Sequence, residues 1–142
     1  MAKYFINILI HLTYLVYFIQ FLAILLQTII NPLKTHFFKD YKQIFCHPNK
    51  LNKFGYANII KKKGSKVAGA IWEITKKHEK ILDSYEQFPN TYQKKNFYLN
   101  GKKIMFYIMH KYFIKNPPKS YIDTINKGYE DCNIELRIKY RF

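Results

Sequence analysis

A charge-free apolar interval divides this chain of 142 residues into two unlike parts. Between Lys3 and Lys34 no side chain carries a charge, and Ile, Leu, Phe, Tyr and Val dominate. All nine Asp and Glu residues and nearly all of the Lys and Arg residues follow this interval. We therefore divide the chain into an atypical apolar segment, residues 1–34, and one compact domain, residues 35–142.

The apolar run from Ile6 to Ile30 exceeds the roughly 20 residues that a helix needs to cross a bilayer. One interpretation is a membrane anchor, and the lysines that follow the run would then leave the C-terminal part in the cytoplasm. Polar side chains within the run, such as Gln20, favour the alternative of a buried strand and helix, because an amide without a partner is costly in a bilayer. The pattern alone leaves both interpretations open.

The second part of the chain is basic, and the formal net charge of the protein is +15. Clustered Lys and Arg residues bind phosphate groups, which would suggest a nucleic-acid partner. Here the lysines are scattered, Arg137 and Arg141 are the only arginines, and no zinc-finger or RNA-binding signature occurs. We therefore expect a solvated lysine-rich surface and no nucleic-acid partner.

The small number of cysteines argues against a disulfide framework or a cysteine-based metal site. Cys46 and Cys132 are too few for either, so we expect free thiols and a reducing, cytoplasmic compartment. The sequence contains no phosphate-binding loop, dinucleotide-binding glycine motif or serine nucleophile elbow. We therefore predict no metal and no cofactor, and we exclude nucleotide-dependent and serine-hydrolase chemistry.

The domain begins with strand patterns. Apolar and β-branched residues predict two short strands, a hairpin-like turn and a longer central strand, in the order Tyr41–Phe45, Tyr56–Ile60, Lys63–Ser65 and Val67–Ile74. Thr75 is expected to cap a helix that continues to about Tyr85, before Pro89 prevents its continuation.

A hairpin and a second helix follow. Asn100-Gly101 is the preferred dipeptide of a type I′ turn and predicts that Tyr92–Leu99 pairs with Lys103–Met109. Ser120 with Asp123 forms a capping pattern that predicts the start of the second helix. This order of strands and helices indicates an α+β fold.

Several segments of the domain carry a resemblance in their order and spacing. They are Gly55-Tyr56-Ala57-Asn58-Ile59, Val67-Ala68-Gly69-Ala70-Ile71-Trp72-Glu73-Ile74, Leu82-Asp83-Ser84-Tyr85-Glu86-Gln87-Phe88-Pro89, Tyr107-Ile108-Met109 and Pro117-Pro118-Lys119-Ser120-Tyr121. Over about residues 38–134 the chain resembles γ-glutamylcyclotransferase-like proteins, and residues 1–5 look like the opening strand of that family. The resemblance implies a small mixed β-barrel or sheet with flanking helices.

The resemblance also implies an activity, in which a small-molecule γ-glutamyl compound cyclises to 5-oxoproline and releases an amine or amino acid. The α-amino group of the substrate attacks its own γ-carbonyl, so the enzyme must accept a proton and stabilise an oxyanion. The family's general base is the glutamate of an L-D-x-x-E motif, which is Glu86 here. Tyr92 and Tyr121 match aromatic positions that line the family's pocket, and they are the candidates for substrate binding.

The spacing of three carboxylates offers a physical reason for a perturbed base. Glu79, Asp83 and Glu86 recur at helical intervals, so they would share one face and repulsion would raise one pKa. The alternative is a solvated acidic stripe that pairs with neighbouring lysines of the sequence, namely Lys76, Lys77 and Lys80.

The N-terminal part departs from the family. Ile6-Asn7-Ile8-Leu9 stands where family members have a Tyr-Gly-Ser-Asn loop that binds the γ-glutamyl group, and Gln87 replaces a common glycine. Three hypotheses follow: a diverged cytoplasmic enzyme, a membrane-anchored form, or a non-catalytic module that keeps the fold. A further hypothesis is a misread reading frame across residues 6–37, because AT-rich codons read out of frame yield apolar residues.

Overall fold

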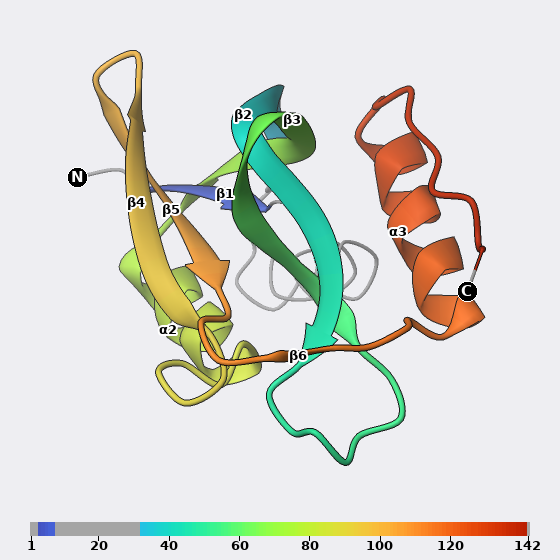
Figure 1. Ribbon diagram of the computed structural model, residues 1–142. Coiled ribbons are helices and arrows are strands. Elements are labelled where there is room, and N and C mark those ends of the chain that lie inside the picture. Colours follow the sequence, from blue (N-terminus) through green and yellow to red (C-terminus); the bar gives the residue numbers. More distant parts are fainter. Residues whose placement is uncertain (1–2, 8–31, 142) are drawn as a thin grey trace.

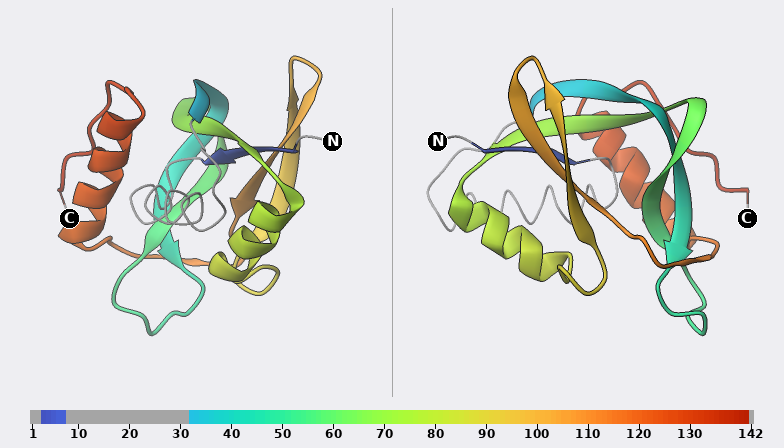
Figure 2. Two further views of the ribbon diagram at one scale, coloured as in Figure 1. Left: turned by 180° about the vertical axis from the view of Figure 1, so that it is seen from behind. Right: turned by 60° about the vertical axis from the view of Figure 1, so that its left-hand side comes forward.

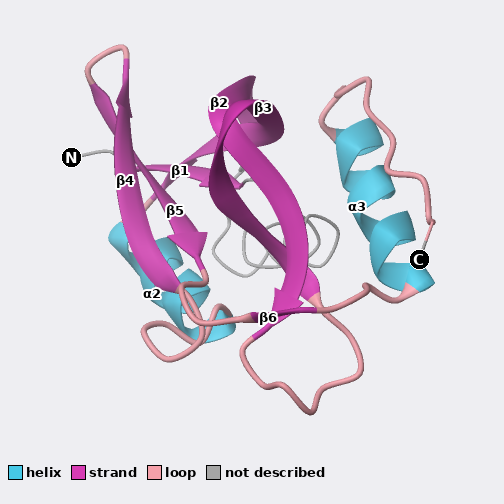
Figure 3. Ribbon diagram, viewed as in Figure 1, coloured by secondary structure: helices cyan, strands magenta, loops and turns pink. Residues whose placement is uncertain are grey.

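A computed structural model describes residues 3–7 and 32–141 (Figure 1). Its elements are, in order, β1 (Lys3–Asn7), β2 (Pro32–His47), β3 (Tyr56–Ile74), α2 (Lys76–Tyr85), β4 (Gln93–Leu99), β5 (Lys102–Ile108), β6 (Phe113–Ile114) and α3 (Lys119–Asp131). The described strands form one six-stranded sheet in the order β4-β5-β1-β3-β2-β6. The mixture of strands and helices in Figure 3 confirms the predicted α+β class.

The sheet is mixed and open. β1 pairs parallel with β5, and the other neighbouring strands pair antiparallel. Within the described residues β4 and β6 end the sheet at opposite edges, so it does not close into a barrel. β1 lies between β3 and β5 and joins the β2–β3 pair to the β4–β5 hairpin. The predicted opening strand is therefore present, as residues 3–7.

The strand prediction was wrong between residues 56 and 74. The two strands expected there, and the turn expected at Lys63–Ser65, are all parts of the single strand β3. Gly64 and Asp40 have positive φ angles of 80° and 61°, and the Gly64 N–H donates a hydrogen bond to Asp40 Oδ1 at 2.8 Å. β2 shifts its register between Lys39 and Tyr41. This irregularity lies opposite Gly64, in paired β-structure rather than at a chain reversal. The chain reverses in residues 48–55, between the expected strands Tyr41–Phe45 and Tyr56–Ile60.

α2 and the β4–β5 hairpin follow the prediction. The Thr75 hydroxyl accepts a hydrogen bond from the His78 N–H, and His78 Nδ1 accepts one from the Thr75 N–H, so the helix begins with a reciprocal capping box. Asn100 and Gly101 both have positive φ angles, as a type I′ turn requires. α2 lies beside the hairpin in each view of Figures 1 and 2.

The start of α3 differs from the prediction. Pro118 is the N-cap and contributes no side-chain hydrogen bond, so the capping pattern of Ser120 with Asp123 is not used. Pro118 already has an extended backbone, with φ at −69° and ψ at 151°, and the helix starts directly after it. Asp123 instead pairs with Lys119 at 2.8 Å. Ile122 and Ile125 of α3 are buried.

The core includes apolar side chains from the sheet and both described helices, such as Trp72, Ile104, Leu82 and Ile125. Both cysteines are free, as the sequence predicted, and both are buried. Most of the apolar interval lies outside the described residues, and so do the loop replacement at Ile8-Leu9 and most of the interval of the frame hypothesis. Across residues 3–7 and 32–141, no helix combines the length and apolar character needed to span a membrane.

Candidate active site

A cavity of about 240 Å³ opens where the end of α2 meets the ends of three strands. Its volume is below the roughly 300–1,000 Å³ of sites for drug-sized ligands, so it suits a group of amino-acid size. The lining residues come from segments far apart in sequence: His47, Pro48, Tyr56, Tyr85, Glu86, Gln87, Thr91, Tyr92 and Met109.

Glu86 is the one carboxylate among these lining residues. It is the C-cap of α2, and its N–H donates a hydrogen bond to the Leu82 carbonyl at 2.8 Å. The residue is 6% exposed, and this burial raises the pKa of its carboxyl group from 4.5 to about 8. A carboxyl group with this pKa changes its protonation state near neutral pH and can both accept and return a proton.

The turn after α2 fixes the position of Glu86. The Gln87 N–H donates to the Ser84 carbonyl and the Phe88 N–H to the Asp83 carbonyl, which is the hydrogen-bond pattern of a Schellman motif. Gln87 has a φ of 51°, the left-handed conformation that this motif needs and that glycine adopts without strain. Gln87 therefore keeps the backbone conformation that a glycine would supply, and its side-chain oxygen accepts a hydrogen bond from the Thr91 hydroxyl at 2.9 Å.

Tyr92 and Tyr121 converge on one residue of β3. The Tyr92 hydroxyl donates to the Ala57 carbonyl, and the Tyr121 hydroxyl accepts from the Ala57 N–H, both at 3.1 Å. Burial raises the pKa of both phenols well above 10, so they stay protonated. Tyr92 lines the cavity, whereas Tyr121 lies behind Tyr56, with their ring centroids 5.3 Å apart and their rings edge to face.

The sequence analysis did not identify His47, Tyr56 or Met109 as lining residues. Met109 is held in place by Asn58, whose side chain donates to the Met109 carbonyl at 2.8 Å and accepts from the Met109 N–H at 2.9 Å. Asn58 is fully buried, and a buried amide needs hydrogen-bond partners. A polar Asn within the apolar run Ala57–Ile60 was the available signal for such a contact.

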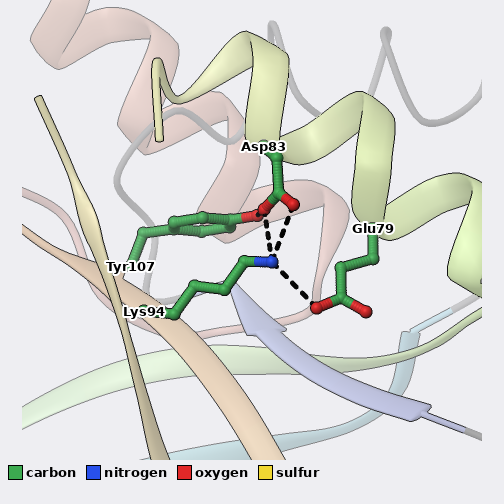
Figure 4. Close-up of polar contacts among 4 residues, drawn as sticks. All are labelled: Glu79, Asp83, Lys94 and Tyr107. Atoms are coloured by element: carbon green, nitrogen blue, oxygen red, sulfur yellow. Dashed lines mark hydrogen bonds and ion pairs between the residues drawn. The ribbon is translucent and has the colours of Figure 1, made fainter. Parts of the chain in front are cut away.

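Glu79, Asp83 and Glu86 do not form the single group of neighbouring carboxylates that their spacing predicted. Lys94 of β4 binds Glu79 at 2.8 Å and Asp83 at 2.6 Å, and the Tyr107 hydroxyl donates to Asp83 (Figure 4). Neither acid lines the cavity. The pKa of Glu86 rises through burial rather than through repulsion. The alternative stripe is also corrected, because the lysine that the structure shows on Glu79 and Asp83 comes from β4 and not from Lys76, Lys77 or Lys80.

Comparisons with known proteins agree with this fold. A family model described as "Gamma-glutamyl cyclotransferase, AIG2-like" matches residues 23–129, which is most of the chain. The match confirms the resemblance found in the sequence, although it begins before residue 38 and ends before residue 134. No curated protein matches the chain.

Solved structures share the fold. One named "Gamma-glutamyl cyclotransferase" is 19% identical, with a TM-score of 0.75, over 96% of this chain and 83% of that one. An uncharacterized protein from Homo sapiens is 18% identical, with a TM-score of 0.71, over 95% of this chain and 82% of its own. YkqA from Bacillus subtilis is 16% identical, with a TM-score of 0.70, over 91% of this chain and 48% of its own.

Proposed function

Because this chain belongs to the AIG2-like γ-glutamyl cyclotransferase family, we propose that it cyclises a small-molecule γ-glutamyl compound to 5-oxoproline, with Glu86 as the general base. The reaction releases an amine or amino acid. The observation that carries the proposal is the Glu86 carboxyl group, which is buried in the cavity wall with its pKa raised to about 8.

The raised pKa suits the proton transfer that the reaction needs. The α-amino group of the substrate enters as an ammonium ion, and this positive charge beside Glu86 favours the ionised carboxylate. Glu86 then accepts a proton, which frees the amine to attack the γ-carbonyl carbon. The new C–N bond closes the five-membered ring, the old C–N bond breaks, and Glu86 returns the proton to the leaving nitrogen.

The small cavity supports the proposal through substrate conformation. Cyclisation requires the amine to approach the carbonyl of the same molecule, so a folded substrate gains the rate advantage of an intramolecular reaction. We propose that the Tyr92 ring binds this folded γ-glutamyl group, since the Tyr92 hydroxyl is directed to Ala57. Tyr121 contributes to substrate binding indirectly, because it supports the Tyr56 ring that lines the cavity.

The test is product release by the purified full chain. We expect γ-glutamyl amino acids or γ-glutamylamines to yield equal amounts of 5-oxoproline and free amine, measured by chromatography. Glu86→Gln should abolish most of this release while the protein keeps its circular dichroism spectrum. Wild-type turnover in Glu86→Gln would show that another group accepts the proton.

The absent Tyr-Gly-Ser-Asn motif favours one alternative, a non-catalytic or membrane-anchored module that retains the fold. This alternative predicts that no γ-glutamyl compound yields 5-oxoproline, although small γ-glutamyl ligands still stabilise the protein against heat. Extraction with alkaline carbonate separates its two forms, since an anchored chain stays with the membrane pellet.

A further inference from the structure

The loop of residues 48–55 lies beside the edge strand β6 (Figure 1), and both segments carry exposed apolar side chains. The loop presents Leu51 and Phe54, which are 91% and 39% exposed, and β6 presents Phe113 and Ile114, which are 45% and 66% exposed. We call these four side chains the apolar tip. Isolated exposed apolar residues are common, but an exposed cluster indicates an interaction surface.

The loop is an ordered structure that holds Leu51 outward. The Asn49 side-chain oxygen accepts a hydrogen bond from the Leu51 N–H at 2.9 Å, and the Asn49 carbonyl accepts one from the Asn52 N–H at 3.3 Å. The Asn49 N–H in turn donates to His47 Nδ1 at 2.9 Å. These bonds turn the chain at Asn49, and they leave the Leu51 side chain at the surface.

The loop and the segment around β6 form one continuous surface. Gly55 donates its N–H to the Asn116 carbonyl at 3.0 Å, and Lys115 Nζ donates to the Lys50 carbonyl at 2.6 Å. A Cβ atom at Gly55 would lie 2.8 Å from the Lys115 Cβ, so the two segments approach as closely as only glycine permits. The two segments that carry the four apolar side chains are therefore held side by side.

The charge around the apolar tip has one sign. Residues 47–56 and 110–118 contain four lysines and no Asp or Glu, and the lysines are Lys50, Lys53, Lys111 and Lys115. Lys53 also lies over the Phe54 ring, with its Nζ 5.1 Å from the centroid. An apolar centre with a cationic rim is complementary to a surface that is anionic outside and apolar beneath.

We propose that the apolar tip and its lysine rim bind the surface of a bilayer that contains anionic phospholipid. Leu51 and Ile114, the two most exposed members of the tip, are aliphatic, so they gain by entering the boundary between headgroups and acyl chains. Nucleic-acid bases would stack on the Phe54 and Phe113 rings, which are less exposed. This inference is independent of the proposed cyclotransferase activity.

The proposed membrane contact lies close to the candidate active site. His47 and Pro48, which line the cavity, lead directly into the loop that presents Leu51. Leu51 itself does not line the cavity. A substitution at Leu51 therefore tests membrane binding without changing a residue that lines the candidate active site.

Vesicle flotation with the full chain tests the proposal. We expect binding to vesicles of phosphatidylcholine with phosphatidylserine, weaker binding to phosphatidylcholine alone, and release by salt. Leu51→Ser should lower the partition coefficient about tenfold, and Lys50→Gln and Lys53→Gln about fivefold each. Leu51→Ser should leave the release of 5-oxoproline in solution unchanged.

The matched controls lie elsewhere on the surface. Tyr98 of β4 is 72% exposed, and Lys62 of β3 is exposed, so Tyr98→Ser and Lys62→Gln remove similar groups outside the tip and its rim. We expect neither change to alter vesicle binding. Equal losses in these controls and in Leu51→Ser would overturn the proposal, because binding would then depend on overall composition.

A Leu51→Trp variant reports on the tip directly, since the sequence has a single tryptophan, Trp72, and it is buried. The tryptophan fluorescence of Leu51→Trp should shift to shorter wavelength when phosphatidylserine vesicles are added, whereas that of Tyr98→Trp should not. No shift at Leu51→Trp would overturn the proposal even if another part of the chain carries the protein to the vesicles. Binding of a single-stranded oligonucleotide that needs the lysines but not Leu51 would also overturn it.

Discussion

Asp83 and Glu86 lie three residues apart, yet their surroundings give them different properties. Asp83 binds Lys94 and accepts a hydrogen bond from Tyr107, and it remains partly exposed to solvent. Glu86 is buried in the cavity wall, and its carboxylate forms no hydrogen bond or ion pair with any described residue. Burial, and not spacing along a helix, therefore sets the proton affinity of the Glu86 carboxyl group.

The end of α2 produces this difference. The helix ends at Tyr85, and the Schellman turn that follows places Glu86 outside the regular helical positions. Glu79 and Asp83, in contrast, lie within the helix beside the β4–β5 hairpin (Figure 4). The helical spacing that relates these three acids in the sequence therefore does not describe their arrangement in space.

The largest expected effect tests Glu86 as the base. Glu86→Gln keeps the size of the side chain but cannot accept a proton, so 5-oxoproline release should fall by about 10²–10⁴-fold. Steady-state kinetics with a γ-glutamyl amino acid measures the loss. Glu79→Gln is the matched control, and an equal loss in that variant would show that the two acids function together.

The second prediction concerns pH. If Glu86 is the base with a pKa of about 8, kcat/KM should rise with pH and level off above that value, and at pH 6 it should be about 100-fold below the plateau. A flat profile between pH 6 and pH 8 would exclude Glu86 from this role.

The same shift predicts a stability difference with a definite sign. The folded-state pKa of Glu86 is raised above its unfolded value of 4.5, so its contribution is fully present below pH 4.5 and is lost as pH rises through about 8. The Tm of the wild type should therefore fall relative to that of Glu86→Gln between pH 5 and pH 9. Thermal unfolding of both proteins across this range measures the difference.

The fourth prediction tests the paired carboxylates. Lys94→Met leaves Asp83 and Glu79 without this cation in a partly buried site, so it should destabilise the fold by about 1–3 kcal/mol. Lys119→Met is the control, because its ion pair with Asp123 is exposed and should contribute about 0–1 kcal/mol. Denaturant unfolding measures both, and equal losses would show that the Lys94 cluster is no stronger than a surface pair.

The smallest expected effect separates burial from repulsion as the cause of the raised pKa. Burial is the cause that the structure shows for Glu86, so Glu79→Gln should move the midpoint of the pH–rate profile by less than about half a unit. Repulsion among the acids would instead lower this midpoint clearly when Glu79 is neutralised.

The accuracy of the sequence predictions depended on how local each signal was. Thr75 and Asn100-Gly101 specify their cap and turn through neighbouring residues, and both predictions were correct. Gly64 resembled a turn residue, but its role depends on Asp40, which lies 24 residues away. Local patterns could not reveal that contact.

The candidate site shows the same limit. The family resemblance pointed to Glu86 as the candidate base, yet the cause proposed for its raised pKa was wrong, because the burial comes from residues distant in sequence. His47 and Met109 carry no catalytic signature of their own. Their place in the cavity wall follows from strand pairing and from Asn58, and neither can be read from single residues.

The contacts of Ala57 also have a consequence for folding. Tyr92 and Tyr121 reach this residue across 35 and 64 positions of the chain. Closing such long loops costs entropy before any contact compensates, so we expect these bonds to form after the local hairpin and helices. A nascent chain that has not yet emerged through Tyr121 would therefore hold Glu86 beside a Tyr56 ring that still lacks its support.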